Sequence, residues 1–201
     1  FCPSSRPSDV ASILKKSPVP VFMLPGAEDW AKCPNPDQSL SDWRDAFVDF
    51  DKNFNHGFRV FRDQNSPENI SILQNGVLFL GFNLVNGPVH DQDAWADREM
   101  KMLNFYFGMT NMNKGQFRAI VLLGNARPTP QQEDFFNTVF TSLKPIGKPM
   151  AYIHANSGGG IREYLPFDGQ KSVYGIEIED GGKNPPLKVT VGFGDRPFLV
   201  G

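Results

Sequence analysis

The chain of 201 residues lacks the features that mark membrane-spanning and nucleic-acid-binding proteins. Its longest apolar run, from Val77 to Val85, is interrupted by Gly81 and Asn83 and falls well short of the ~20 residues that span a bilayer. It has no cluster of lysine and arginine, and its formal net charge is -2, so it offers little electrostatic attraction to nucleic acid or anionic lipid. We therefore expect a soluble protein with no nucleic-acid partner and no membrane-spanning segment.

The chain also lacks the internal repeats, low-complexity tracts and charge blocks that would divide it into parts. Its composition, with 40% hydrophobic and 21% charged residues, is typical of a globular protein. A chain of this length buries roughly 70% of the surface that its unfolded form exposes, which is enough for a substantial core. We expect a single domain, residues 1–201.

Cysteine is scarce, and Cys2 and Cys33 are the two that the chain has. A disulfide that closed the proline-rich segment between them would stabilise the fold by about 3 to 4 kcal/mol on the chain-entropy model. The alternative is two unrelated buried thiols. The sequon that starts at Asn69 is a candidate glycosylation site, and together with a disulfide it favours a secretory or organellar lumen. The chain begins at Phe1 rather than Met, so we expect a processed product or part of a longer protein.

The first part of the chain carries the patterns of one strand and two helices. Val19–Leu24 is a short apolar run bounded by prolines, which predicts a buried strand that leads into a loop. Ser8 and Asp9 are candidate caps of a short helix before it. Ser39 is the candidate cap of the next helix, whose aromatic residues have the i, i+4, i+7 spacing of a buried stripe: Trp43, Phe47 and Phe50.

A hairpin and a long helix are predicted in the middle of the chain. Phe58–Phe61 and Ile70–Leu73 have the composition of strands, and Asn75-Gly76 joins the second of them to Val77–Leu84. The Asn-Gly pair is the strongest short hairpin signal. His90-Asp91 then begins an amphipathic helix, in which the early acids complement the helix dipole. A role as metal ligands is the alternative for these two residues.

The rest of the chain alternates strands and helices. The predicted elements are strand Ala119–Leu123, helix Gln131–Leu143, and strands Met150–His154, Ser172–Glu179 and Leu187–Phe193. This order predicts the α/β class, with helices and sheets in layers and with sheets packed face to face.

Three loops directly follow the carboxyl ends of predicted strands, after Leu24, Leu123 and His154. In open α/β sheets, ligand sites gather at the edge where such loops converge. We therefore expect these three strand ends to lie close together, and any functional site to lie among them.

Several ordered segments of the chain resemble the calcineurin-like metallophosphoesterases, and more narrowly a microbial and algal branch of that family. The first segment, from Val19 to Pro36, holds a Pro-Gly turn, an acidic tryptophan-containing stretch and Cys-Pro-Asn-Pro. Further matches, spread over nearly the whole chain, are Asn75–Phe79, Val89–Asp91, the strand ends at Gly124 and His154, and Gly181–Leu187. The resemblance implies a layered α/β/β/α metallophosphoesterase-like sandwich that lacks its N-terminal strands. This chain would then be the C-terminal portion of the family fold.

The resemblance also implies where metal ligands would lie. The family uses two divalent cations, which hold the phosphate and generate a hydroxide from a shared water. Its early Asp-x-His and Gly-Asp motifs would precede the first residue of this chain. The later ligand positions fall at Glu28, where the family has an Asn, at Asn125, where an imidazole is absent, and at His154 and Gly158, where the family has a pair of histidines.

Of these positions only His154 keeps the family's ligand type. It is either a vestigial ligand or a hydrogen-bonded histidine at a strand end. Glu28 is either an oxygen ligand or, like Asp29 beside it, a structural or solvated acid. An Asn amide is a weak ligand and glycine has no side chain, so Asn125 and Gly158 do not replace the missing imidazoles. We expect no catalytic residue and no bound metal at these positions.

Two functional interpretations follow from the resemblance. In the first, the chain is a catalytically inactive metallophosphoesterase-like protein that acts as a structural or interaction subunit of a larger assembly, with protein partners and no cofactor. In the second, it is a divergent metal-dependent phosphoesterase, acting on phosphomonoesters or phosphodiesters with Mn, Fe or Zn, whose N-terminal ligands lie outside this chain. A surface rich in exposed phenylalanine would favour the first, because the chain has 18 and large exposed apolar patches mark interaction sites.

We predict that Cys2 and Cys33 form a disulfide. Mass spectrometry of the unreduced protein, alkylated under denaturing conditions, should find neither cysteine labelled and one peptide pair linked through them. After reduction, both should take the label. Two labelled cysteines without reduction would disprove the pairing.

Overall fold

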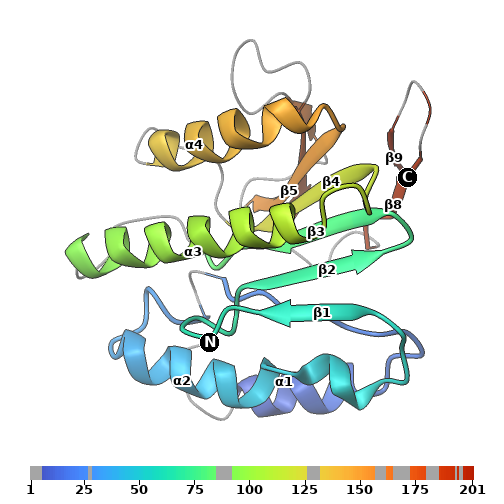
Figure 1. Cartoon of the computed structure of the whole chain (residues 1–201). Helices are drawn as coiled ribbons and strands as arrows, with labels where there is room; N and C mark the ends of the chain where they lie inside the picture. Colours follow the sequence, from blue (N-terminus) through green and yellow to red (C-terminus); the bar gives the residue numbers. More distant parts are fainter. Residues whose placement is uncertain are drawn as a thin grey trace.

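The computed structural model describes residues 6–26, 29–84, 92–125, 132–156, 162–164, 173–179, 186–192, 194 and 197–201. These residues form a mixed α/β fold, which confirms the predicted class (Figure 1). No helix within those ranges is both long enough and apolar enough to cross a membrane. The elements are α1 (Arg6–Leu14), α2 (Pro36–Phe47), η2 (Phe50–Asn53), β1 (Arg59–Arg62), β2 (Ile70–Gln74), β3 (Val77–Gly81), α3 (Gln92–Met112), β4 (Ala119–Gly124), α4 (Glu133–Leu143), η4 (Lys144–Ile146), β5 (Met150–Asn156), β6 (Arg162–Tyr164), β7 (Val173–Glu179), β8 (Val189–Val191) and β9 (Phe198–Val200).

The main sheet has seven strands in the order β1-β2-β3-β4-β5-β7-β6. β1, β2 and β3 form an antiparallel meander, whereas β3, β4, β5 and β7 run parallel. The chain crosses from β3 to β4 through α3 and from β4 to β5 through α4. Because parallel strands all end on the same side, the ends of β3, β4, β5 and β7 form one edge, which we call the carboxyl edge.

The two faces of the sheet are covered by different elements. On one face, α3 and α4 bury their apolar side chains against β3, β4 and β5, with Tyr106 and Phe136 packed against Leu80, Leu122 and Tyr152. On the other face, the separate β8–β9 hairpin packs on the sheet. α1 and α2 do not lie on the sheet itself. They pack on Val21 and Met23 of the segment between them (Figure 1).

The predicted strand Val19–Leu24 is wrong as a strand, because it pairs with no strand among the described residues. Its side chains still alternate as in a strand. Val21 and Met23 pack on α1 and α2, whereas Phe22 and Leu24 face the main sheet. Prolines at 18, 20 and 25 lack an N–H, which limits the ladder that the segment can form.

The predicted hairpin is confirmed. β2 and β3 pair in register around Asn75 and Gly76, whose φ angles are 49° and 75°. A type I′ turn needs positive φ at both central residues, which Asn and Gly tolerate best.

The helix that carries the aromatic stripe begins at Pro36 rather than Ser39, with Asn35 as its cap.

Most other predicted elements are confirmed with small shifts of their ends. Trp43, Phe47 and Phe50 are buried together as expected. The predicted last strand is shorter than expected, Val189–Val191, and it pairs with the unpredicted strand β9. The start of the third helix at His90-Asp91 lies outside the described residues.

Gly81, the last residue of β3, lies where four parts of the fold meet. A Cβ added to it would lie 2.8 Å from Leu24 Cδ2 and 2.9 Å from Ile70 Cγ1. On its other side, the buried hydroxyl of Tyr106 in α3 donates to the Gly81 carbonyl, and burial raises the pKa of that hydroxyl. Only glycine lets the Leu24 segment pack this closely on the sheet.

We predict that Gly81→Ala lowers the free energy of unfolding by about 1 to 3 kcal/mol, because the added methyl pushes Leu24 and Ile70 apart. Urea unfolding followed by circular dichroism measures the change. Gly108→Ala is the matched control, since a Cβ there meets nothing within 4 Å and alanine in a helix gains about 0.5 to 1 kcal/mol over glycine. Equal effects of the two variants would contradict the predicted clash.

Candidate functional site

The carboxyl edge carries a transverse row of residues that the register brings together. Gly124 of β4 pairs with His154 of β5, and His154 pairs with Glu177 of β7. Residues in register on neighbouring strands share a face, and both His154 and Glu177 are 1% exposed. The row therefore sets an imidazole beside a carboxylate in the interior of the protein.

The ring of His154 is held by its own strand. Its Nδ1 lies 2.9 Å from the carbonyl of Ala155, and the ring stacks on Tyr152 with centroids 5.0 Å apart. A carbonyl only accepts, so Nδ1 carries a proton and donates it to Ala155. Metal-bound histidines often have this backbone contact, but so do many structural ones. Both interpretations of His154 stay open on this geometry.

Glu177 is a candidate that the sequence analysis missed. It lies within the strand Val173–Glu179, whose side chains alternate between the two faces of the sheet. An acidic residue at a buried position of that strand is the sequence feature that could have indicated a site. Its Oε1 is buried and has no hydrogen-bond partner among the described residues. A buried carboxylate oxygen without a donor is costly, so this position is the least satisfied polar group of the row.

Asn125 and the segment after Leu24 lie against one another at the same edge. Asn125 Nδ2 is 3.1 Å from the position that a Cβ on Gly26 would take, and Asp29 Oδ2 accepts from the Gly26 N–H at 2.8 Å. Asp29 therefore has a structural role in this turn. Glu28 and Gly158 lie outside the described residues.

Leu24, Leu123 and His154 lie close together as expected, although Leu24 does not end a strand of the sheet. Leu24, Leu123 and His154 line one cavity of about 470 Å³ on the sheet face opposite α3 and α4. We call this cavity the sheet-face groove. Its walls are mainly apolar and come from the Val19–Leu24 segment and from β2, β3, β4, β5 and β7: Phe22, Leu24, Ile72, Phe79, Leu123, Ile153 and Ile178.

One wall of the sheet-face groove is aromatic. The rings of Phe22 and Phe58 stack with centroids 5.8 Å apart, and His56 packs behind Phe58 at 5.0 Å. The His56 Nδ1 accepts from the Phe58 N–H at 3.2 Å, which fixes the ring behind the wall. This wall is therefore built from side chains that hold one another in place.

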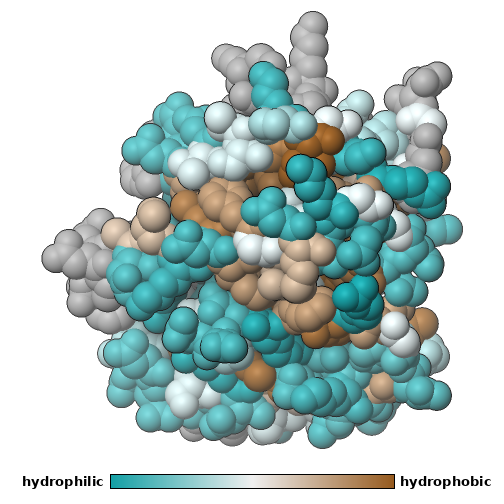
Figure 2. Space-filling view, in the orientation of Figure 1, coloured by the Kyte–Doolittle hydropathy of each residue, from teal (hydrophilic) through white to brown (hydrophobic). Residues whose placement is uncertain are grey.

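The phenylalanines do not gather on the outer surface of the described residues. None of them is among the exposed large hydrophobic side chains, whereas α3 exposes Met100 and Met112. Figure 2 shows the side on which α3 and α4 lie, where apolar residues form a band across the middle between polar regions. The phenylalanine-rich surface that would have favoured the interpretation as an inactive subunit is thus not found among the described residues, while Phe22, Phe58 and Phe79 line the sheet-face groove.

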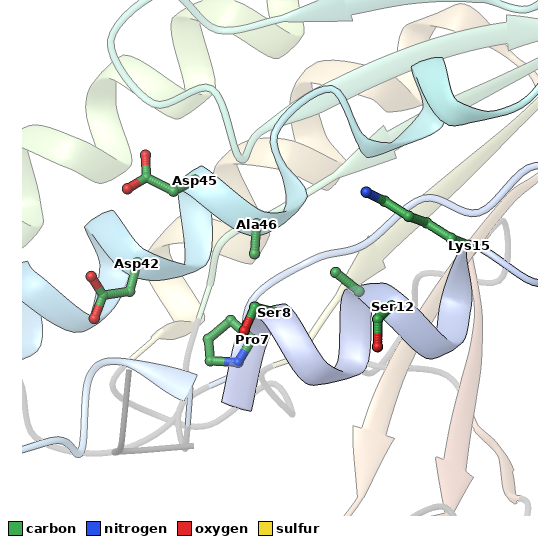
Figure 3. A pocket seen from close by; sticks show the side chains of 8 residues that line it. Pro7, Ser8, Ser12, Lys15, Asp42, Asp45 and Ala46 are labelled. Carbon is green, nitrogen blue, oxygen red and sulfur yellow. The ribbon is translucent and has the colours of Figure 1, made fainter. Parts of the chain in front are cut away.

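A second cavity, of about 440 Å³, lies between α1 and α2 (Figure 3). Ser12 and Lys15 line it from α1, and Asp42 and Asp45 line it from α2. The two carboxylates point in different directions in Figure 3, and they do not converge on a common ligand position. We do not assign a site there.

A buried polar network, also missed by the sequence analysis, lies at the end of β3. The Glu68 carboxylate, 0% exposed, accepts from Arg44 at 2.8 and 2.9 Å and from Asn83 Nδ2 at 2.9 Å. Trp30 Nε1 donates to Asn83 Oδ1 at 3.2 Å. The guanidinium of Arg98 lies 5.0 Å from the Trp30 ring, and burial lowers its pKa while Glu68 opposes that shift.

The burial of Asn69 in the folded chain weighs against its glycosylation. Asn69 is 1% exposed, and its Oδ1 accepts from the Asn83 backbone N–H at 2.9 Å. A glycan needs room outside the protein, and this side chain lies inside it.

The disulfide between Cys2 and Cys33 stays a prediction. Cys33 is buried and is not a free thiol, and Cys2 lies outside the described residues.

The described donors do not fit the two-metal centre of the family. Within the parts of the chain that the structure describes, no group of three or more His, Cys, Asp or Glu side chains lies close enough to hold a metal ion. His154 and Glu177 are one imidazole and one carboxylate, and Asn125 offers a weak amide oxygen.

Comparison with known proteins does not assign a family. No family model, no curated protein and no solved structure matches the chain.

We predict that Glu68→Gln lowers the free energy of unfolding by about 3 kcal/mol, because it leaves Arg44 and Arg98 without the buried carboxylate. This value is at the low end for a broken buried pair, since Arg44 is partly exposed. Asp97→Asn is the control, because the surface pair Lys101–Asp97 contributes only about 0.5 kcal/mol. Urea unfolding measures both, and a Glu68→Gln effect no larger than that of the control would contradict a structural role for the network.

Proposed function

We propose that this chain is a catalytically inactive metallophosphoesterase-like protein that acts as a structural or interaction subunit of a larger assembly. The observation that carries the proposal is the sheet-face groove, a mainly apolar cavity on a sheet face that is only partly covered. Cavities of this size, lined by aliphatic and aromatic side chains with few polar groups, bind other molecules by burial of apolar surface. Such a surface suits binding rather than hydrolysis of a charged phosphate ester.

The layer order supports the family resemblance without establishing it. The Val19–Leu24 segment and the β8–β9 hairpin both lie on the sheet face opposite α3 and α4, and α1 and α2 pack outside the segment. We propose that these parts correspond to an incomplete second β layer of an α/β/β/α sandwich. A location in a secretory or organellar lumen depends on the disulfide and is proposed with it.

The ligand positions support the absence of catalysis in this proposal. His154 is buried and stacked on Tyr152, and its Nδ1 is engaged by Ala155. The side chain of Asn125 packs at Gly26. Each of these positions has a role in holding the carboxyl edge together, which explains why its residue can persist without a metal.

A divergent metal-dependent phosphoesterase is the second candidate. The observation that favours it is that the strand register sets His154 opposite Glu177, whose buried Oε1 has no hydrogen-bond partner among the described residues. A divalent cation such as Mn, Fe or Zn would need further ligands from outside this chain or from Glu28. Such a cation would supply a hydroxide for attack on phosphorus.

We predict that the purified chain, dialysed against Mn, Fe or Zn and then against buffer, retains far less than one metal ion per chain by elemental analysis. Hydrolysis of para-nitrophenyl phosphate should not exceed the metal-only blank. The physical reason is that one imidazole and one carboxylate do not hold a metal against water.

Two variants distinguish the candidates. If the chain is an enzyme, turnover with added metal should vanish in His154→Ala and persist in His56→Ala, since His56 lies behind the aromatic wall of the groove and away from the row. That pattern would overturn the proposal of an inactive protein.

A further inference from the structure

The backbone of Val21–Leu24 is extended but unpaired. None of its N–H or C=O groups forms a hydrogen bond with another residue that the structure describes. The four residues are half-buried, and their side chains pack on the α1–α2 layer and line the sheet-face groove. A row of unpaired N–H and C=O groups on an extended segment is a template for another strand.

The same segment forms one wall of the sheet-face groove. Phe22 and Leu24 line the groove, and the opposite wall is the sheet face with the half-buried side chains of Leu123, Ile153 and Ile178. Ile70, Ile72 and Gln74 line it along β2, which gives a length of about 14 Å at about 3.4 Å per residue. This is the span of a strand of about five residues, one more than the unpaired segment has.

We propose that the sheet-face groove binds an extended strand of a partner polypeptide, which pairs with the backbone of Val21–Leu24 and places alternate apolar side chains against Leu123, Ile153 and Ile178. This mode is strand addition, in which main-chain hydrogen bonds give affinity and pockets for alternate side chains give specificity. The inference rests on the proposed function, because it names how the interaction subunit would hold its partner.

Other occupants fit the groove less well. A helix satisfies its own backbone and would leave the N–H and C=O groups of Val21–Leu24 unpaired. A small apolar molecule has no alternating donors and acceptors to offer them. A second copy of the chain would show itself by protection that appears only as the chain dimerises.

Hydrogen exchange of the full chain tests the proposal. The probe is a panel of peptides of about ten residues in which Val, Ile or Phe alternates with Thr. At peptide concentrations about ten times the dissociation constant, the two alternate amides of Val21–Leu24 that face the bound strand should exchange about ten-fold more slowly, because binding must be lost before they exchange. The same peptides N-methylated at alternate amides should bind at least about ten-fold more weakly, because the ladder hydrogen bonds are lost.

Matched variants locate the binding. Ile178→Glu, which puts a charge on the wall of the groove that the sheet forms, should abolish the protection of the amides from exchange. Ile13→Thr, at a residue that is 64% exposed on α1, should leave it unchanged. If Ile178→Glu does not fold, Phe22→Thr on the opposite wall serves the same purpose.

Several results would overturn the inference. They are the absence of binding by every peptide of the panel, binding that leaves the Val21–Leu24 amides unprotected, equal binding of the N-methylated peptides, and protection that appears only as the chain dimerises. Metal-dependent hydrolysis would overturn the proposed function but would leave these exchange results unaffected. The two failures are therefore distinguishable.

Discussion

The buried carboxylate of Glu68 is the constraint on which much of the fold depends. It is fully buried, and it joins α2 through Arg44 to the end of β3 through Asn83. Asn83 in turn holds Trp30, so the segment that follows the unpaired Val21–Leu24 stretch is fixed to the same point. A buried charge is tolerated only when its partners stay in place, so the network couples the α1–α2 layer to the sheet.

The parallel register then determines what the carboxyl edge can do. It sets Gly124, His154 and Glu177 in one row, and the missing side chain of Gly124 leaves room for Tyr152, whose hydroxyl would be 2.7 Å from an added Cβ. Tyr152 stacks on His154 and fills the space beside it. The row therefore has one unsatisfied oxygen, on Glu177, in otherwise packed surroundings. Packing of this kind suits a structural role for His154. The unsatisfied carboxylate of Glu177 is the feature that favours the alternative of a metal-dependent enzyme.

Local sequence patterns predicted the parts of the fold that local physics determines. Asn75-Gly76 predicted the hairpin because few residue pairs accept two positive φ angles, and the spacing of Trp43, Phe47 and Phe50 predicted the buried stripe. The network around Glu68 could not be predicted, because its members come from segments far apart in the chain. Asn69 shows the same limit, since a sequon does not tell whether its side chain is buried.

The incorrect strand prediction at Val19–Leu24 is the most informative of these differences. The sequence has the alternation of a strand, and the structure keeps that alternation, with Val21 and Met23 on the helices and Phe22 and Leu24 on the groove. What is missing is the ladder, which a segment cannot make alone, because strand pairing is a property of two segments. The strand-like sequence, the extended backbone without a ladder and the apolar groove beside it all agree with the proposal that a partner polypeptide supplies the second strand.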